Sequence, residues 1–334
     1  MSRDRRARIL GTGLFVPPDV VTNRDLEKLM DTTDEWIVQR SGIKERRFAA
    51  PGVGPSDLAY EAANKALAAA GVEAGELDMI LFATLSPDYY FPGSGVFLQD
   101  RLKCKTIPAL DVRNQCSGFL YGLSVAQQFI ENGTYDKILL VGAEVHSHAL
   151  NLATPGRDVS VLFGDGAGAV VLGASKDPER GVLSVHLHSE GQHRDHLKIE
   201  YPSIRSKPYI TNEILEQGLH WPKMDGKFVF KHAVTRMPEV VHEALGANHL
   251  KPSDVDLYLF HQANLRINEA AMKHLDQPME KSFNNIDRYG NCSAASIPML
   301  IDECVRGGRL KSGDLVCMAA FGAGFTWASA LVRW

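Results

Sequence analysis

The stretch that decides the fold reads Asp111-Val112-Arg113-Asn114-Gln115-Cys116-Ser117-Gly118-Phe119, an apolar run that stops at a cysteine and resumes as a helix. Residues 107–112 predict a short buried strand, and the apolar residues of 119–130 fall near helical spacing until Asn132-Gly133 ends the helix. A cysteine at such a junction meets the unpaired N–H groups and positive dipole end of the helix, which favour thiolate over thiol. The stretch therefore predicts a nucleophile. The alternative is a small buried residue, since free cysteine is among the most buried types.

The composition is that of an ordinary globular protein: 334 residues, 45% hydrophobic and 23% charged. A net charge of −4 argues against a general nucleic-acid binder. The five cysteines contain no C-x-x-C pair, which suits a reducing compartment better than a disulfide framework or a zinc site.

The beginning of the chain faintly resembles a signal peptide, because arginines precede the apolar run 9–16. Pro17-Pro18-Asp19 follows at once without a small-residue cleavage site, so this region predicts a strand and a turn. No apolar run approaches the roughly 18 residues of a membrane span. We therefore expect a cytoplasmic protein that binds neither membrane nor nucleic acid.

Strand-like and helix-like stretches alternate along the chain, which is typical of layered α/β packing. A helix over 56–70, with Ser56 as its N-cap, precedes a strand over 79–83. A second helix over 235–246 precedes a strand over 257–260.

Two further pairs of segments are similar to each other and occur in the same order. Residues 137–143 resemble 314–320, and 164–172 resemble 322–331. These echoes predict two related halves, 1–175 with the cysteine and 176–334 with its partners. The alternative is that α/β proteins reuse generic strand–turn patterns. Segment 186–226 breaks the rhythm and predicts an irregular excursion or lid.

Three later segments could serve a nucleophilic cysteine. His261 follows a buried strand, Asn291 lies in the polar loop 289–296, and 321–325 is a glycine-rich turn. The alternatives are a solvated histidine, a helix cap and tight backbone packing, respectively. The order Cys, His, Asn also fits papain-like thiol hydrolases, but their local cysteine signature is absent.

Five motifs in one order make the chain recognisable: Cys-Ser-Gly-Phe, Gly-Asp-Gly-Ala-Gly-Ala, His-Gln-Ala-Asn, Tyr-Gly-Asn-Cys-Ser-Ala-Ala-Ser and Ala-Phe-Gly-Ala-Gly-Phe-Thr-Trp. They begin at residues 116, 164, 261, 289 and 320, and residues 34–47 match as well. Together they closely resemble the β-ketoacyl-acyl-carrier-protein synthase III family of thiolase-fold condensing enzymes. The resemblance implies an α/β, thiolase-like duplicated αβαβα five-layer fold.

The resemblance also implies the chemistry. Cys116 would take the acyl group from an acyl-CoA, and malonyl-ACP would then lose CO2 and attack the acyl-cysteine in a Claisen condensation. His261 and Asn291 would stabilise the enolate as two neutral donors. The backbone N–H groups of Cys116 and Ala323 would form the oxyanion hole over the acyl carbonyl. Neither a metal nor another cofactor is implied.

Binding residues follow from the same resemblance. Trp36 and Arg157 would sandwich the CoA adenine. The pantetheine path would be lined by Thr32, Arg40, Gly226 and Asn264. A basic patch for an acidic carrier protein would be formed by Lys231, Arg266 and Lys273. Phe91 would reach across a homodimer interface into the partner's acyl pocket.

Related activities can be compared with this pattern. Thiolases carry a second catalytic cysteine where this chain has Ala320, and elongating synthases use two histidines. A ketosynthase III-like acyltransferase that forms an ester or amide without decarboxylation stays open. A non-catalytic thiolase-fold subunit is disfavoured by the intact Cys, His and Asn set.

Two departures concern the primer. Arg113-Asn114-Gln115 stands where small residues are common in the family, and the excursion 193–225 is rich in apolar residues that could wall a longer acyl chain. We therefore expect a medium or longer acyl-CoA primer. The apolar residues in question are Tyr201, Ile204, Tyr209, Ile210, Ile214, Leu215, Leu219 and Trp221.

Two motifs are expected to be decoys. The four histidines within 186–196 suggest a metal site, but no acidic or thiol ligand completes a convincing set with them. The glycine run 164–168 lacks the Gly-Lys-Ser/Thr ending of a phosphate loop, which predicts tight backbone packing instead.

Overall fold

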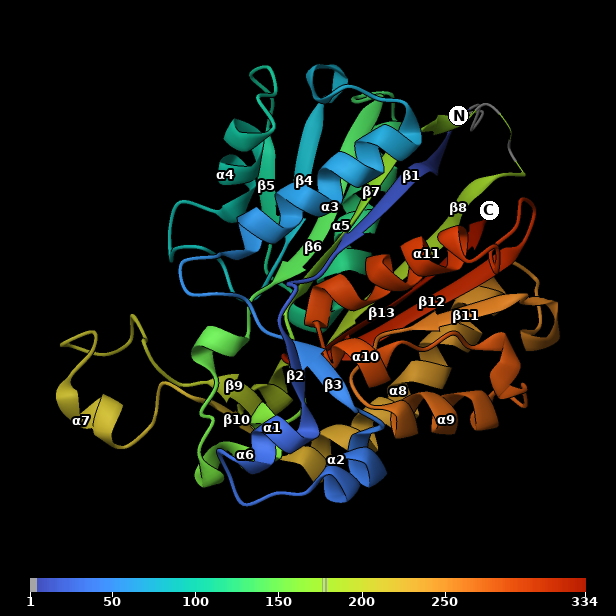
Figure 1. The fold of residues 1–334 in the computed structure, drawn as a ribbon. Helices are drawn as coiled ribbons and strands as arrows, with labels where there is room; N and C mark the ends of the chain where they lie inside the picture. Colours follow the sequence, from blue (N-terminus) through green and yellow to red (C-terminus); the bar gives the residue numbers. More distant parts are fainter. Residues whose placement is uncertain (1–4, 176, 178) are drawn as a thin grey trace.

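The computed structural model describes residues 5–175, 177 and 179–334. Two β-sheets form its frame (Figure 1). The first sheet has the order β1-β7-β6-β4-β5 and the second β11-β12-β13-β8. Their strands are β1 Arg6–Phe15, β4 Met79–Ala83, β5 Ala109–Val112, β6 Lys137–Glu144, β7 Gly166–Ser175, β8 Gly181–Ser189, β11 Leu257–Phe260, β12 Leu315–Gly322 and β13 Thr326–Arg333.

Four strands of each sheet are arranged in the same way. β1, β7 and β6 pair antiparallel and β4 pairs parallel with β6, just as β8, β13 and β12 pair antiparallel and β11 pairs parallel with β12. The sequence echoes fall on these equivalent strands, β6 with β12 and β7 with β13. The division of the chain between residues 175 and 176 stays a prediction, and residue 176 itself lies outside the described residues.

Helices complete five layers, as the duplicated thiolase-like fold predicts. α5 (Gly118–Glu131) and α11 (Ser296–Arg306) lie between the sheets, and their apolar residues share one core with strands of both. α3 (Pro55–Ala70) covers the outer face of the first sheet. α8 (Gly226–Ala247) and α9 (Leu265–His274) cover the outer face of the second (Figure 1).

The apolar runs of the strands follow from this burial on both faces. In β6, Ile138 and Leu140 face the central layer, whereas Leu139 and Val141 face α3. A strand covered on both sides needs apolar residues at every position, which is why its sequence does not alternate with polar residues.

Predicted element boundaries are partly confirmed. Strands 79–83 and 257–260 are as predicted, but the helix expected over 56–70 begins at Pro55, with Gly54 as its N-cap. Ser56 instead donates its hydroxyl to Asp88 Oδ1 at 2.8 Å. The strand predicted as buried before Cys116 is β5, which lies at the edge of the first sheet, and its Leu110 is 43% exposed.

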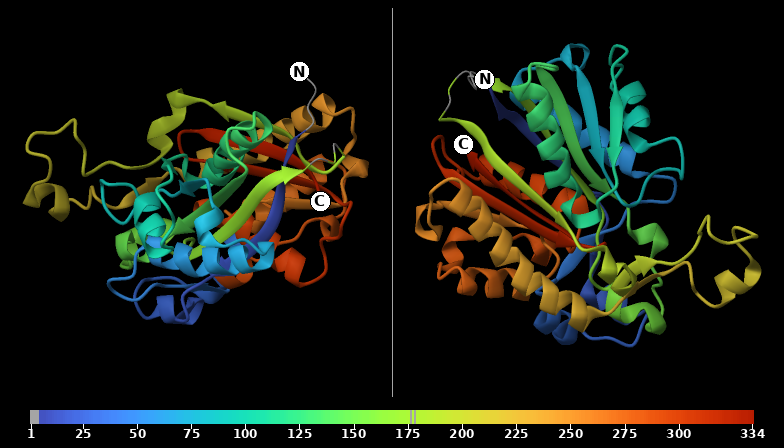
Figure 2. Two further views of the ribbon diagram at one scale, coloured as in Figure 1. Left: turned by 90° about the horizontal axis from the view of Figure 1, so that it is seen from above. Right: turned by 180° about the vertical axis from the view of Figure 1, so that it is seen from behind.

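Of the remaining elements, α4 (Ser94–Arg101) packs beside α3 against β4 and β5, and its Leu98 belongs to the same outer core. The others lie toward one end of the two sheets (Figure 1). They are β2 Val20–Thr22, α1 Asn23–Glu27, α2 Asp34–Ser41, β3 Glu45–Arg47, α6 Arg157–Ser160 and α10 Ile286–Tyr289. The predicted excursion contains β9 (Leu197–Ile199), α7 (Asn212–Glu216) and β10 (Pro222–Met224). The part with α7 projects from the body as an arm (Figure 2). None of the helices in the described ranges combines the length and apolar character needed to span a bilayer.

Candidate active site

One cavity of about 840 Å³ contains all three predicted catalytic side chains, Cys116, His261 and Asn291. Cys116 lies in a short 3-10 turn after β5, and His261 directly follows β11. Asn291 forms an isolated bridge with Phe163. Because β5 and β11 run parallel to their neighbours, their carboxyl ends meet where functional groups of α/β sheets collect. Tertiary structure thus joins residues up to 175 positions apart in sequence.

The cysteine is deeply buried, which decides its resting protonation. Burial raises the pKa of Cys116 to about 11, although the Ser293 hydroxyl and the N–H groups of Cys116 and Ala323 act in the opposite direction. The prediction that the helix terminus alone favours a thiolate is therefore wrong. The free energy lost when the thiolate is removed from water exceeds the stabilisation that the helix dipole and the nearby donors provide.

His261 is held as a neutral donor. Its Nδ1 lies 2.7 Å from Ser296 Oγ, and Ser296 Oγ already accepts the N–H of Gln262 at 3.4 Å. The serine hydroxyl is therefore assigned as the donor and Nδ1 as the acceptor, so the proton of the neutral ring lies on Nε2. Nε2 is buried and has no partner among the described atoms. Burial also lowers the pKa of His261 to about 3.

Asn291 is oriented by its own loop. Its Oδ1 accepts the N–H of Ser293 at 2.8 Å, so the amide nitrogen remains available as a donor to a bound group. Two neutral donors in one cavity suit a reaction in which an oxyanion appears only as the transition state forms.

We expect the decarboxylation of a malonyl thioester to keep its rate between about pH 5.5 and 8, because His261, with its lowered pKa, stays neutral over that interval. The ordinary histidine pKa of about 6.5 would instead make the donor cationic in part of it. The measurement is the pH dependence of CO2 release by enzyme that already carries an acyl group. A titration step near pH 6.5 that disappears in His261→Asn would contradict this assignment.

The glycine turn brings backbone against the nucleophile. A Cβ on Gly322 would lie 2.7 Å from Cys116 Cβ and 3.1 Å from its backbone nitrogen, closer than non-bonded atoms approach. Gly322 and Phe321 also line the cavity. The sequence left open whether this turn approaches the active site or serves only tight backbone packing. The structure favours the approach to the active site.

A cationic and aromatic cluster lies at the predicted CoA site. Trp36 and Arg40, four residues apart on α2, face each other, with the guanidinium 4.5 Å from the ring centroid. The guanidinium of Arg157 lies 4.9 Å from the same centroid. Trp36 and Arg40 line the cavity, as do Gly226, Asn264 and Arg266.

Other predicted binding residues lie outside the cavity lining. Thr32 is half-buried, with its hydroxyl unpaired among the described atoms. Lys231 on α8 and Lys273 on α9 are exposed, on helices that pack against each other. Phe91 is 80% exposed.

The primer-wall prediction is wrong for a single protomer. Among the described residues, the eight apolar residues of 201–221 do not line the cavity. The part of this segment with α7 projects from the body as an arm (Figure 2). Residues 113–115 do not line it either. Leu197 and Met224, at the base of the arm, line it instead, together with Phe163.

Sequence reasoning missed Lys227, which lines the cavity, and two serines that hydrogen-bond the predicted catalytic side chains, Ser293 and Ser296. Both serines lie within the motif 289–296, where they resemble ordinary helix-start residues. Nothing in the sequence distinguishes a capping serine from one that contacts a distant cysteine or histidine.

The decoy motifs have structural explanations. His186 and His188 both contact the Glu243 carboxylate, at 3.2 and 2.6 Å, and no metal-holding group of three ligands is found within the described residues. A Cβ on Gly168 would lie 2.6 Å from the backbone nitrogen of Met299, so part of the glycine run serves packing against α11, as predicted.

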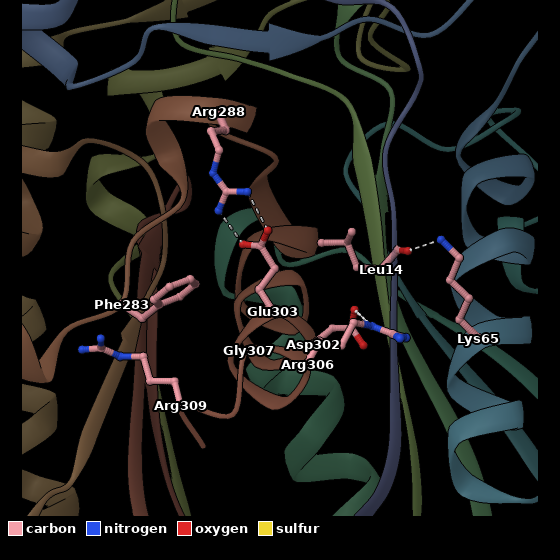
Figure 3. A pocket seen from close by; sticks show the side chains of 9 residues that line it. All are labelled: Leu14, Lys65, Phe283, Arg288, Asp302, Glu303, Arg306, Gly307 and Arg309. Atoms are coloured by element: carbon pink, nitrogen blue, oxygen red, sulfur yellow. Dashed lines mark hydrogen bonds and ion pairs between the residues drawn. The ribbon is translucent and has the colours of Figure 1, made fainter. Parts of the chain in front are cut away.

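A second hollow, about 910 Å³ in volume, holds none of the predicted site residues (Figure 3). It is lined by residues of α3, α10 and α11 among others, and most of its charges are paired. Arg288 contacts Glu303 at 2.8 Å and Arg306 contacts Asp302 at 2.7 Å. The charged groups here stabilise one another and offer no comparable reactive group.

A duplicated five-layer α/β fold with Cys, His and Asn in one cavity defines the class of thiolase-fold condensing enzymes. Family models described as "3-Oxoacyl-[acyl-carrier-protein (ACP)] synthase III" and its C-terminal part match residues 110–191 and 245–334. The chain belongs to the β-ketoacyl-[acyl-carrier-protein] synthase III family.

Full-length relatives agree. The chain is 45% identical to the β-ketoacyl-[acyl-carrier-protein] synthase III of Alkalilimnicola ehrlichii, with 98% of this chain and 99% of that protein covered. The corresponding protein of Shewanella oneidensis is 46% identical over 98% and 99%. Among solved structures, 3-oxoacyl-[acyl-carrier-protein] synthase III from Aquifex aeolicus is 41% identical, with a TM-score of 0.90, covering 98% of this chain and all of that one.

Proposed function

We propose that the protein loads an acyl group from an acyl-CoA onto Cys116 and condenses it with malonyl-ACP, giving a 3-oxoacyl-ACP, CoA and CO2 in fatty-acid or related biosynthesis. The observation that carries the proposal is a single cavity in which a buried thiol faces two neutral donors, His261 and Asn291. Family membership supports the same reaction.

In the first step the Cys116 sulfur attacks the thioester carbonyl, the bond to CoA sulfur breaks, and the thiol proton leaves with CoA. The N–H groups of Cys116 and Ala323, which lower the pKa of the sulfur, are assigned to the oxyanion that forms beside it. Because the resting thiol is protonated, its ionisation forms part of the acylation barrier.

In the second step malonyl-ACP loses CO2, and His261 Nε2–H and the Asn291 amide hydrogen-bond the enolate oxygen. The carbanion attacks the acyl-cysteine carbonyl, the carbon–sulfur bond breaks, and Cys116 recovers a proton. Neutral donors favour this step because they stabilise the developing charge without neutralising the substrate carboxylate beforehand.

The entrance is assigned to CoA. In the present structure Arg157 stacks directly on Trp36. An adenine between them needs two contacts of about 3.5 Å each, so Arg157 moves away from the ring when the nucleotide enters. Arg40, Gly226 and Asn264, which line the cavity, are assigned to the pantetheine path, and Thr32, outside the lining, is assigned to its outer end. The Asn264 amide donates to Arg40 O at 2.8 Å and so links two of these residues.

The carrier protein is assigned to the cationic surface of α8 and α9 around the cavity mouth. Arg266 and Lys227 line the mouth, and Lys231 and Lys273 are exposed on the same pair of helices. Cations clustered at the entrance steer an acidic partner even when the net charge of the chain is −4.

A homodimer is supported by an apolar edge. Tyr89, Tyr90 and Phe91 are 62%, 62% and 80% exposed, and their loop abuts the open edge strand β5, where Ser94 N–H bonds Asp111. Exposed aromatic clusters and unpaired strand edges are stabilised by a second chain. We expect Phe91 to enter the partner's acyl pocket and the protein to work in the cytoplasm.

We propose that the primer carries a medium or longer acyl chain and not acetyl. The support is the volume of the cavity and its apolar lining by Phe163, Leu197 and Met224. A series of acyl-CoA lengths measures kcat/KM directly. A maximum at acetyl-CoA would reject this part of the proposal without affecting the reaction type.

The deciding experiment is intact mass spectrometry after incubation with a panel of acyl-CoA esters and then with malonyl-ACP. We expect an acyl adduct that peptide mapping locates at Cys116 and that malonyl-ACP discharges with release of CO2. No adduct with any thioester would refute the mechanism. An adduct discharged only by an alcohol or amine would replace it with ester or amide formation.

A further inference from the structure

Ser293 occupies a backbone conformation that its side chain does not favour. Its φ of +46° lies in the left-handed region, which residues other than glycine rarely adopt. The residue is fully buried in the turn that begins after Asn291 and leads into α11. Such positions persist when the surrounding structure holds them, and they cluster at functional sites.

This conformation directs two donors of one residue to two catalytic side chains. The backbone N–H of Ser293 donates to Asn291 Oδ1 at 2.8 Å, and its hydroxyl donates to Cys116 Sγ at 3.5 Å. No other acceptor takes the hydroxyl proton among the described residues. Among the described residues, Ser293 is thus the one that hydrogen-bonds both the sulfur of Cys116 and the side-chain amide of Asn291.

The hydroxyl matters more as charge develops on sulfur. A neutral thiol is a weak acceptor, whereas a thiolate accepts a charge-assisted bond about twice as strong. Among the groups that lower the pKa of the Cys116 thiol, the Ser293 hydroxyl has the largest effect, ahead of the backbone N–H groups of Cys116 and Ala323. A donor already aimed at the sulfur therefore assists its ionisation in a site that burial makes unfavourable.

We infer that Ser293 is a positioning residue that promotes formation of the Cys116 thiolate through its hydroxyl while its backbone N–H sets the orientation of Asn291. The inference rests on the proposed function and divides its two steps: the hydroxyl serves acylation, and the backbone serves decarboxylation. Removal of the hydroxyl alone should therefore impair the first step and spare the second.

The test uses Ser293→Gly and Ser293→Ala in the full-length protein. Glycine adopts positive φ without strain and keeps the N–H, so it removes the hydroxyl without destabilising the turn. Ser293→Ala removes the same hydroxyl but retains the strained φ. A matched control is Ser329→Ala, which deletes another fully buried hydroxyl, one that donates to Val240 O at 2.8 Å.

The first measurement is the pH dependence of iodoacetamide labelling at the Cys116 peptide. In both Ser293 variants we expect the midpoint to rise by about one pH unit and acylation at pH 7 to slow about tenfold. Single-turnover condensation from preformed acyl-enzyme should change less than about threefold, because the N–H to Asn291 is kept. If Ser293 only stabilised the turn, Ser293→Gly with an unchanged melting temperature would leave the titration midpoint of the Cys116 thiol where it is in wild type.

The outcomes separate this inference from the proposed reaction. A midpoint unchanged in Ser293→Gly, or an equal rise in Ser329→Ala, overturns the role of Ser293 even if Cys116 is acylated. Another outcome is a midpoint that rises in Ser293→Gly while no acyl-CoA acylates the wild-type protein. That result would support the hydroxyl–sulfur contact and reject the proposed function.

Discussion

Asn291→Asp is expected to slow malonyl decarboxylation by about a thousandfold while leaving acylation of Cys116 within about threefold of wild type. The aspartate keeps an oxygen to accept the Ser293 N–H, so the loop retains its local geometry. It removes the amide donor and places a negative charge where the enolate oxygen forms. His261→Ala removes the other donor, which is expected to cost about a hundredfold to a thousandfold, or about 2.7–4 kcal/mol of transition-state stabilisation.

The two steps are measured separately, acylation by mass spectrometry and decarboxylation by CO2 release from acylated enzyme. Asn248→Ala provides a control, because Asn248 caps the far end of α8 and its amide bonds Ser184 and Ala244. Equal losses in both steps for Asn291→Asp would mean that the variant disturbs the whole site. Full decarboxylation in that variant would remove Asn291 from the proposed mechanism.

Gly322→Ala is expected to lower acylation of Cys116 about a hundredfold. The added Cβ would lie 2.7 Å from Cys116 Cβ, so either the glycine turn or the nucleophile has to move. Displacement of a reacting atom by about 1 Å costs this order of rate even when the chemistry is otherwise intact. The measurement is the rate of adduct formation with the best acyl-CoA, together with the melting temperature.

Gly246→Ala is the matched control. Gly246 lies in α8, and a Cβ there meets nothing within 4 Å. Alanine in a helix is more stable than glycine by about 1 kcal/mol, so this variant should melt at the same or a higher temperature and keep full activity. Wild-type acylation in Gly322→Ala would show that the turn is not held against Cys116 in solution.

Local patterns predicted the elements that depend on local forces. Strands 79–83 and 257–260 were predicted to the residue because apolar runs bounded by acidic turns have few other structures. The helix after Cys116 ends at Glu131, and the predicted stop Asn132-Gly133 supplies its C-cap, Asn132, and a glycine at φ +74°. The N-cap of α3 was misplaced, because Ser56 found a partner in Asp88, 32 residues away, and a sequence does not reveal that neighbour.

Motif order predicted that Cys116, His261 and Asn291 belong together, and the structure brings them to one cavity. It could not predict the protonation of the cysteine. The helix that follows Cys116 favours a thiolate through its dipole, but the burial of Cys116 depends on every segment that packs around the cysteine, including Gly322 from the other sheet. The apolar residues of 201–221 also suggested a pocket wall, but hydrophobicity alone does not state which surface a residue covers.

The sequence by itself determined the layered α/β fold and the internal echoes, and it predicted Cys116 as the nucleophile, because each depends on residue type, spacing and order along the chain. Only the tertiary structure decided how the nucleophile is controlled: a buried protonated thiol, a histidine kept neutral, and a serine in a left-handed turn that contacts both Cys116 and Asn291. The physical reason is that burial and hydrogen-bond direction are set by residues from distant segments, and these come together only when both sheets have closed around the central helices.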